Sequence, residues 1–205
     1  MAFEQASSPG DPSGEPHRYQ PQHVPAAVGT FGLWLFLASL FMLFGAVMIG
    51  YVFIRLARAN GLPPGSIHLP DLLWLSTALV IGVSVALGRS LYQLRIERQQ
   101  SFKHWLNASL LLGAAFLVVQ APAMVMLLSA FGRSGAFVYR LIFVLVLLHA
   151  LHVVGGMVAL VRVVVRGSRG VYDHEHYLPV RHVVVYWHFL DVVWITMFTT
   201  FLLTR

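Results

Sequence analysis

The sequence predicts an all-α integral membrane protein, a bundle of five transmembrane helices. Hydrophobic residues make up 58% and charged residues 11% of the 205 residues, which is too apolar for a soluble domain of this length. The apolar residues lie in five continuous runs, and none alternates with period two as barrel strands do. Because a helix needs roughly 20 apolar residues to cross a bilayer core about 30 Å thick, five spans use most of the chain.

The five runs define the predicted elements in order. Residues 1–28 are polar and contain five prolines, which predicts a mobile N-terminal tail. The remaining residues, 29–205, are expected to form a five-helix transmembrane domain. Its spans are predicted at about 31–54, 72–88, 105–132, 141–161 and 183–204. The segments between these spans have the composition of loops.

The basic residues predict the orientation in the membrane, because Lys and Arg accumulate on the cytoplasmic side. If the N-terminus is inside, nine of the 14 Lys and Arg residues are inside: Arg18, Arg89, Arg95, Arg98, Lys103, Arg162, Arg166, Arg169 and Arg181. The N-terminus is therefore predicted to be cytoplasmic and the C-terminus periplasmic or extracellular. The net charge of +6 is expected to meet lipid phosphates rather than nucleic acid.

The fifth span carries polar side chains at membrane depth. Trp187, Asp191 and Trp194 recur at i, i+4 and i+7 and so share one helix face, while His188 precedes Asp191 by three residues. An ionised Asp at the centre of a span costs roughly 2.5 to 3.5 kcal/mol on insertion scales, so it needs a partner or a proton. This face is expected to turn inward.

The fourth span supplies the candidate partners, His149 and His152, which are three residues apart. Helical rise places His152 about 13 Å and Asp191 about 12 Å from the inner ends of their predicted spans. We therefore predict an interhelical polar cluster of His149, His152, His188 and Asp191, with a contact between His152 and Asp191.

These histidines also raise the question of a metal or haem. A bis-histidine haem needs facing ligands at one depth, and a zinc or copper site needs a closed set of ligands. The sequence offers three histidines within spans, no repeated set and no cysteine. Interhelical hydrogen bonding is therefore favoured, and no catalytic, metal or cofactor residue is predicted.

The last span closely resembles a known family signature. Residues 186–194, with the sequence YWHFLDVVW, resemble the last helix of subunit III of the haem-copper respiratory oxidases. The two-histidine run SGAFVYRLIFVLVLLHALHVVGG is similar to that family's penultimate helix. The run LLGAAFLVVQA resembles the middle helix with Gln120 at its glutamine, and FGLWLFLASLFMLFGAVMIGYVF resembles the first shared helix. The resemblance covers roughly residues 30–205 and implies the five-helix bacterial type.

Two positions depart from the family pattern. The family has a buried glutamate directly after the serine of its first shared helix, where Leu40 follows Ser39 here. After Gln120 the family continues towards a second glutamate, whereas Ala121, Pro122 and Ala123 follow here. An inherited proton-related role of this region is therefore in doubt. Four side chains remain candidates for packing or for a lipid cleft: Trp34, Gln120, Trp187 and Trp194.

The resemblance implies a non-catalytic accessory subunit of a bacterial inner-membrane terminal oxidase. Such a subunit would pack against catalytic subunit I and other subunits, bind phospholipid, and support proton uptake and stability during turnover. Haem and copper would belong to the catalytic subunit and not to this chain. The resemblance also places a lipid cleft between the first two spans and the remaining three.

Two other functions remain open at this stage. One is an accessory subunit associated with nitric oxide reductase, which shares these spans and also varies at the buried acid. The other is a small proton-coupled transporter that would use His152 and Asp191 as a relay. The sequence shows no inverted repeat or pair of broken helices that would favour a transporter.

Overall fold

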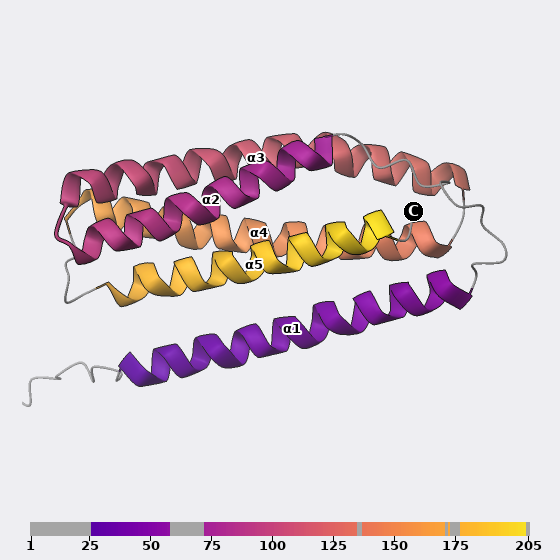
Figure 1. Cartoon of the computed structure of the whole chain (residues 1–205), viewed down its shortest axis with the longest axis horizontal. Coiled ribbons are helices and arrows are strands. Elements are labelled where there is room, and N and C mark those ends of the chain that lie inside the picture. The colour runs from indigo at the N-terminus through magenta and orange to yellow at the C-terminus, as the bar shows by residue number, and fades with distance from the viewer. Residues whose placement is uncertain (1–25, 58–71, 135–136, 171, 173–176, 204–205) are drawn as a thin grey trace, which may run out of the picture.

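The structure, a computed structural model, describes residues 26–57, 72–134, 137–170, 172 and 177–203, and these contain five helices and no strand (Figure 1). Each helix is long and apolar enough to cross a membrane, which confirms the predicted five-span all-α fold. The helices are α1 (Ala26–Ala57), α2 (Leu72–Arg95), α3 (Gln99–Ser134), α4 (Phe137–Ser168) and α5 (Leu178–Leu203).

The helices extend beyond the apolar runs, and this corrects the expected loop between the second and third spans. Residues 89–104 were expected to be a loop, but α2 continues to Arg95 and α3 already begins at Gln99. The tight turn between them is formed around Glu97, which has a φ of 59°. Ser90 and Leu94 continue the buried face of α2, and long basic side chains can reach water from a helix end, so charge does not end the helix.

The N-terminal boundary also lies earlier than expected, because α1 begins at Ala26 rather than near residue 29. Residues 1–25 of the predicted tail lie outside the described residues.

Helix α5 lies at the centre of the bundle. It packs against α1, α2 and α4, while α2 packs most extensively against α3, and α3 against α4. Helix α1 lies on the outside, where it contacts α4 and α5 but, over the described residues, not α2 (Figure 1). The expected division into the first two spans and the remaining three is therefore wrong. Helix α2 packs with α3 and α5, and α1 is the separate helix, which packs against α4 and α5.

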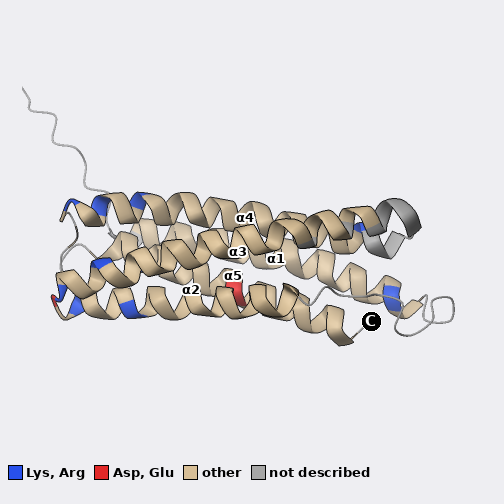
Figure 2. Cartoon of the chain, turned by 90° about the horizontal axis from the view of Figure 1, so that it is seen from above, with Lys and Arg blue, Asp and Glu red and all other residues tan. Residues whose placement is uncertain are grey.

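Two hydrophobic cores hold this arrangement together. The larger one joins α2, α3, α4 and α5 around Trp187, which is fully buried. The smaller one joins α1 to α4 and α5 through side chains that include Tyr51, Leu145 and Met197. Lys and Arg residues lie mainly towards the helix ends (Figure 2). One end, called the basic end below, carries Arg95, Arg98, Lys103, Arg162, Arg166, Arg169 and Arg181.

Candidate functional site: polar groups around helix α5

Trp194 of α5 connects three other helices. Its Nε1 donates a hydrogen bond of 3.0 Å to Oγ1 of Thr77 on α2. Its ring lies edge-on to Phe116 of α3, at 5.9 Å between ring centroids, and 5.2 Å from the ring of His149 on α4. Because this indole is only 2% exposed, it fixes α5 against its neighbours rather than facing lipid.

Trp187 fills a slot between α3 and α4 that two glycines leave open. A Cβ atom at Gly113 would lie 3.6 Å from Cη2 of Trp187, and one at Gly156 would lie 3.3 Å from its Cε2. Glycine at both positions therefore lets two backbones approach the indole closely. The Nε1 atom of Trp187 is buried and has no hydrogen-bond partner, so packing rather than hydrogen bonding holds this ring.

The two histidines of α4 do not bond to α5 through their rings. His149 is buried between the rings of Trp194 and Phe44, and neither of its ring nitrogens has a hydrogen-bond partner. His152 donates from Nδ1 to the carbonyl of Leu148, one turn earlier in its own helix, at 2.6 Å. The ring of His152 also lies 5.4 Å from the ring of Phe44 on α1. Both imidazoles are thus close to α1.

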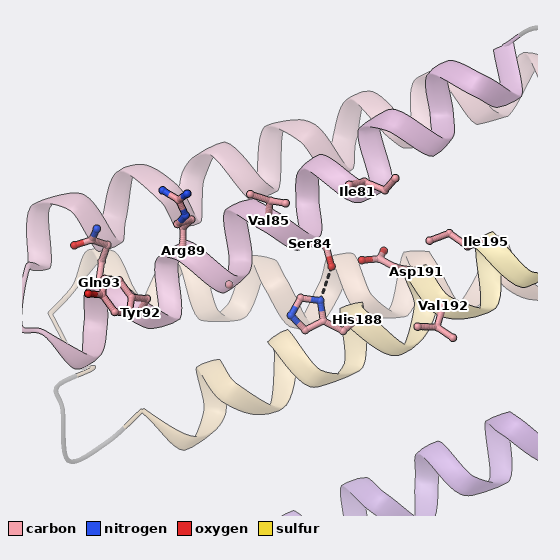
Figure 3. Close-up of a pocket in the computed structure, with 11 residues that line it drawn as sticks. Ile81, Ser84, Val85, Arg89, Tyr92, Gln93, His188, Asp191, Val192 and Ile195 are labelled. Atoms are coloured by element: carbon pink, nitrogen blue, oxygen red, sulfur yellow. Dashed lines mark hydrogen bonds between the residues drawn. The ribbon is translucent and has the colours of Figure 1, made fainter.

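His188 and Asp191 face a different helix, α2. A hydrogen bond joins Nδ1 of His188 to Oγ of Ser84. Ser84 also lies beside the Asp191 carboxylate, so the three polar side chains form one group (Figure 3). Asp191 is only 5% exposed, and neither of its carboxylate oxygens has an aligned hydrogen-bond partner. The nearby Ser84 oxygen is the one bound to His188.

The predicted four-residue cluster is therefore divided into two parts. His149 and His152 lie towards α1, whereas His188 and Asp191 lie towards α2 with Ser84 between them. The expected hydrogen bond between His152 and Asp191 is not formed. The cause is that α5 is surrounded by α1, α2 and α4. Two side chains at the same depth in the membrane can therefore face different helices.

The remaining candidates differ in their surroundings. Gln120 is buried on α3, and its Oε1 has no hydrogen-bond partner. Trp34 is 60% exposed on α1 and so is not part of the packed interior of this chain. Leu40 is buried on the same helix. With Leu40 and Phe44 there, α1 offers His152 no acid, which agrees with the bond of His152 to its own helix.

Sequence reasoning missed the two hydroxyl residues of α2. Thr77 and Ser84 are seven residues apart, so they share one face of that helix. Their partners Trp194 and His188 are six residues apart on the antiparallel helix α5. The two hydrogen bonds therefore join α2 and α5 at two different levels. The seven-residue spacing of two hydroxyls in an apolar span was the available signal.

A groove runs along the surface between α2 and α5. It has a volume of about 800 Å³ and extends from the middle of the spans towards the basic end (Figure 3). Its walls are mostly apolar, and Ser84, His188 and Asp191 line its middle. Arg89 also lines it, but its guanidinium lies 5.8 Å from the ring of Trp105 on α3 and points away from α5 (Figure 3).

The described residues contain no group of three or more His, Cys, Asp or Glu side chains that could hold a metal ion. The fold defines a multi-pass membrane protein, and some of its intramembrane polar side chains join helices. The family model for cytochrome c oxidase subunit III matches residues 17–204, and the chain belongs to this family.

Individual relatives span nearly the whole chain. Subunit 3 of the cytochrome bo(3) ubiquinol oxidase of Pseudomonas aeruginosa is 30% identical over 187 residues, covering 89% of this chain and 88% of the relative. Cytochrome c oxidase subunit 3 of Corynebacterium diphtheriae is 30% identical over 188 residues, with 85% of each chain covered. Quinol oxidase subunit 3 of Bacillus spizizenii is 25% identical over 188 residues, with 91% of each covered. The resemblance read from the sequence is thereby confirmed, and both electron-donor types occur among the relatives.

Proposed function

We propose that this chain is the non-catalytic accessory subunit III of a proton-pumping haem-copper terminal oxidase that reduces oxygen to water. The family match over residues 17–204 carries the proposal. The site supports it, because two pairs of mid-membrane polar side chains join α2 to α5. Thr77 binds Trp194, Ser84 binds His188, and His152 binds its own helix. Haem and copper then reside in the catalytic subunit, against which this chain packs.

The deciding experiment is purification of the tagged chain from its own host in mild detergent, followed by mass spectrometry and an optical spectrum. A haem-bearing oxidase subunit should co-purify in stoichiometric amount. Oxygen consumption by the complex should be inhibited by cyanide. A chain that purifies alone from membranes that contain the oxidase would refute the proposal. Recovery with a nitric oxide reductase instead would assign it to the alternative complex.

A transporter is the alternative of another class. It would require contact between His152 and Asp191, whereas His152 lies against Phe44 of α1 and Asp191 lies beside Ser84 of α2 (Figure 3). Reconstitution of the isolated chain in liposomes tests this alternative directly. Proton-coupled uptake by the chain alone would support a transporter and count against an accessory subunit.

Phospholipid is the proposed ligand of this chain. Because α1 does not contact α2 over the described residues, the lipid is not placed in the expected cleft. The candidate lipid site is instead a cavity of about 310 Å³ between α1, α4 and α5. Phe36, Gly155 and Tyr186 line its apolar part. His182, whose Nε2 lies 3.2 Å from Oγ1 of Thr30, gives it a polar group near the start of α5. An experimental map of the complex should show an acyl chain here, and side chains from another subunit in this space would contradict the proposal.

The proposed location is the bacterial inner (plasma) membrane, with the N-terminus cytoplasmic and the C-terminus outside. The concentration of basic residues at one end of the bundle supports this orientation. Cysteine introduced at the C-terminus should react with an impermeant maleimide once the outer membrane is permeabilised, while the inner membrane is still intact. Cysteine introduced near Arg98, in the α2–α3 turn, should react only after cell lysis.

A further inference from the structure

The groove between α2 and α5 places hydrogen-bonding groups at the middle of the membrane, on the outside of this chain. Helical rise places His188 about 15 Å and Asp191 about 20 Å along α5 from its first residue, within a hydrocarbon core about 30 Å thick. His188 is exposed, and Asp191 is buried beside it with neither oxygen bonded. Ionisable groups at this depth normally pair or face a protein interior.

Helix α2 cannot satisfy this group by itself. The single Ser84 hydroxyl is bonded to Nδ1 of His188 and has at most one proton to offer Asp191, which leaves Nε2 of His188 and at least one oxygen of Asp191 without a partner from α2. The apolar neighbours in the groove, Val85 and Ile195, have no polar side-chain atom to offer. A further donor or acceptor must therefore come from outside the chain.

A lipid is poorly suited to this position. Acyl chains carry no hydrogen-bonding group, and phospholipid headgroups stay at the membrane surfaces, far from Asp191. The basic side chain that lines the groove, Arg89, is turned towards Trp105 on α3, so it is not presented to a phosphate in the groove (Figure 3). A protein helix, in contrast, can place a polar side chain at any depth.

We propose that the α2–α5 groove is the docking site for a transmembrane helix of the catalytic subunit, one that carries a hydrogen-bonding side chain level with His188 and Asp191. Apolar residues of that helix would pack on Val85, Val192 and Ile195. Its polar side chain would bind Nε2 of His188 and, after a small shift of the Ser84 side chain, the Asp191 carboxylate. This inference rests on the proposed function and adds to it the face through which the subunits meet.

Photocrosslinking in the assembled complex tests the proposal. A benzophenone amino acid replaces Val192, which is 63% exposed in the groove, or Leu111, which is 71% exposed on α3. Both positions lie about 18–21 Å from the basic-end start of their helices, so they sample the same depth. Illumination of native membranes, purification and peptide mapping then identify what each position contacts.

The expected result is a crosslink from Val192 to a transmembrane helix of the co-purifying haem subunit that has a polar residue at this level, while Leu111 reacts with lipid. Reaction of Val192 with lipid alone, with a second copy of this chain, or no more often with the haem subunit than Leu111 does would overturn the inference. In each of these cases the haem subunit still co-purifies, so the proposed function is judged separately. Loss of co-purification from the unsubstituted chain would instead contradict the proposed function.

A pair of substitutions gives an independent measure. His188→Leu should weaken retention of the haem subunit about 3- to 20-fold, the range expected for losing one intramembrane hydrogen bond. The matched change His152→Leu, on the α1 side, should leave retention unchanged because its Nδ1 bonds within α4. Thermal unfolding of each variant should show that both remain folded. Equal retention by the two variants would contradict the docking site.

Discussion

Substitution of Gly156 by alanine should loosen the contact between α4 and α5, while the same change at the neighbouring Gly155 should not. A Cβ atom at Gly156 would lie 3.0 Å from Cε1 of Tyr186 and 3.3 Å from Cε2 of Trp187. At Gly155 the nearest atom would be Oη of Tyr186 at 3.9 Å, an ordinary van der Waals contact. The two glycines thus form a matched pair on one helix.

The two rings at Gly156 have little freedom to move away. The Tyr186 hydroxyl donates a 2.9 Å hydrogen bond to the carbonyl of His152, and its ring stacks on Phe36 at 6.0 Å. Trp187 is fully buried between α3 and α4. Overpacking of such a site costs about 1–3 kcal/mol. Replacing glycine by alanine within a helix contributes about 0.5–1 kcal/mol in the opposite direction, equally at both positions.

The difference between the two variants therefore isolates the packing cost at Gly156. For a chain of this size 1 kcal/mol corresponds to about 2–4 °C in Tm, so the alanine variant of Gly156 should unfold about 2–12 °C below that of Gly155. Thermal unfolding in one detergent, followed by size-exclusion chromatography at a single heating rate, measures the difference. If both variants unfold at the same temperature, the close approach of α4 to these rings is wrong.

Three further outcomes follow from the site. Thr77→Val should lower the free energy of unfolding by about 0.5–2 kcal/mol because Nε1 of Trp194 loses its acceptor, and a double-mutant cycle with Trp194→Phe should show that the two effects are coupled. Asp191→Leu should leave the isolated chain at least as stable as the unsubstituted chain, since the carboxylate has no aligned partner, yet it should reduce the amount of haem subunit that co-purifies. Asp191→Asn should retain more of the haem subunit than Asp191→Leu does. Metal analysis of the isolated chain should find no stoichiometric iron or copper, and either metal would contradict the proposed accessory role.

The existence of the five helices could be predicted because the length of each hydrophobic run in the sequence can be compared directly with the thickness of the bilayer core. The helix ends could not be read in the same way. At Arg89 the apolar run stops, but the helix continues to Arg95, since Leu94 still packs in the core and the arginines reach beyond the hydrocarbon. The hydrophobic runs therefore indicate which part of each helix lies in the hydrocarbon core, and not where the helix begins or ends.

The candidate site shows a second limit of sequence reasoning. Helical rise placed His152 and Asp191 at one depth, but depth is only one of the coordinates that decide a contact. Each residue also has an angle around its helix axis, and that angle gains meaning only when the neighbours are known. Because α5 has α1, α2 and α4 around it, turning inward is compatible with several partners. Asp191 is directed to Ser84 on α2, while His152 approaches Phe44 on α1.

The unpartnered polar groups of the bundle fall into two kinds with different consequences. His149 and Trp187 are enclosed, one by the rings of Phe44 and Trp194 and the other by the slot between Gly113 and Gly156. A partner subunit cannot reach them without opening the bundle, so their cost is internal and is offset by aromatic packing.

His188 and Asp191 line the surface groove instead, where an arriving helix can supply the missing hydrogen bonds. Free energy that is unavailable to the isolated chain is then recovered on assembly. If this is correct, replacing Asp191 with leucine separates the two states, because it removes an unsatisfied group from the free subunit and a partner from the complex. Opposite effects of one substitution on stability and on assembly would distinguish a docking residue from one that only holds the fold.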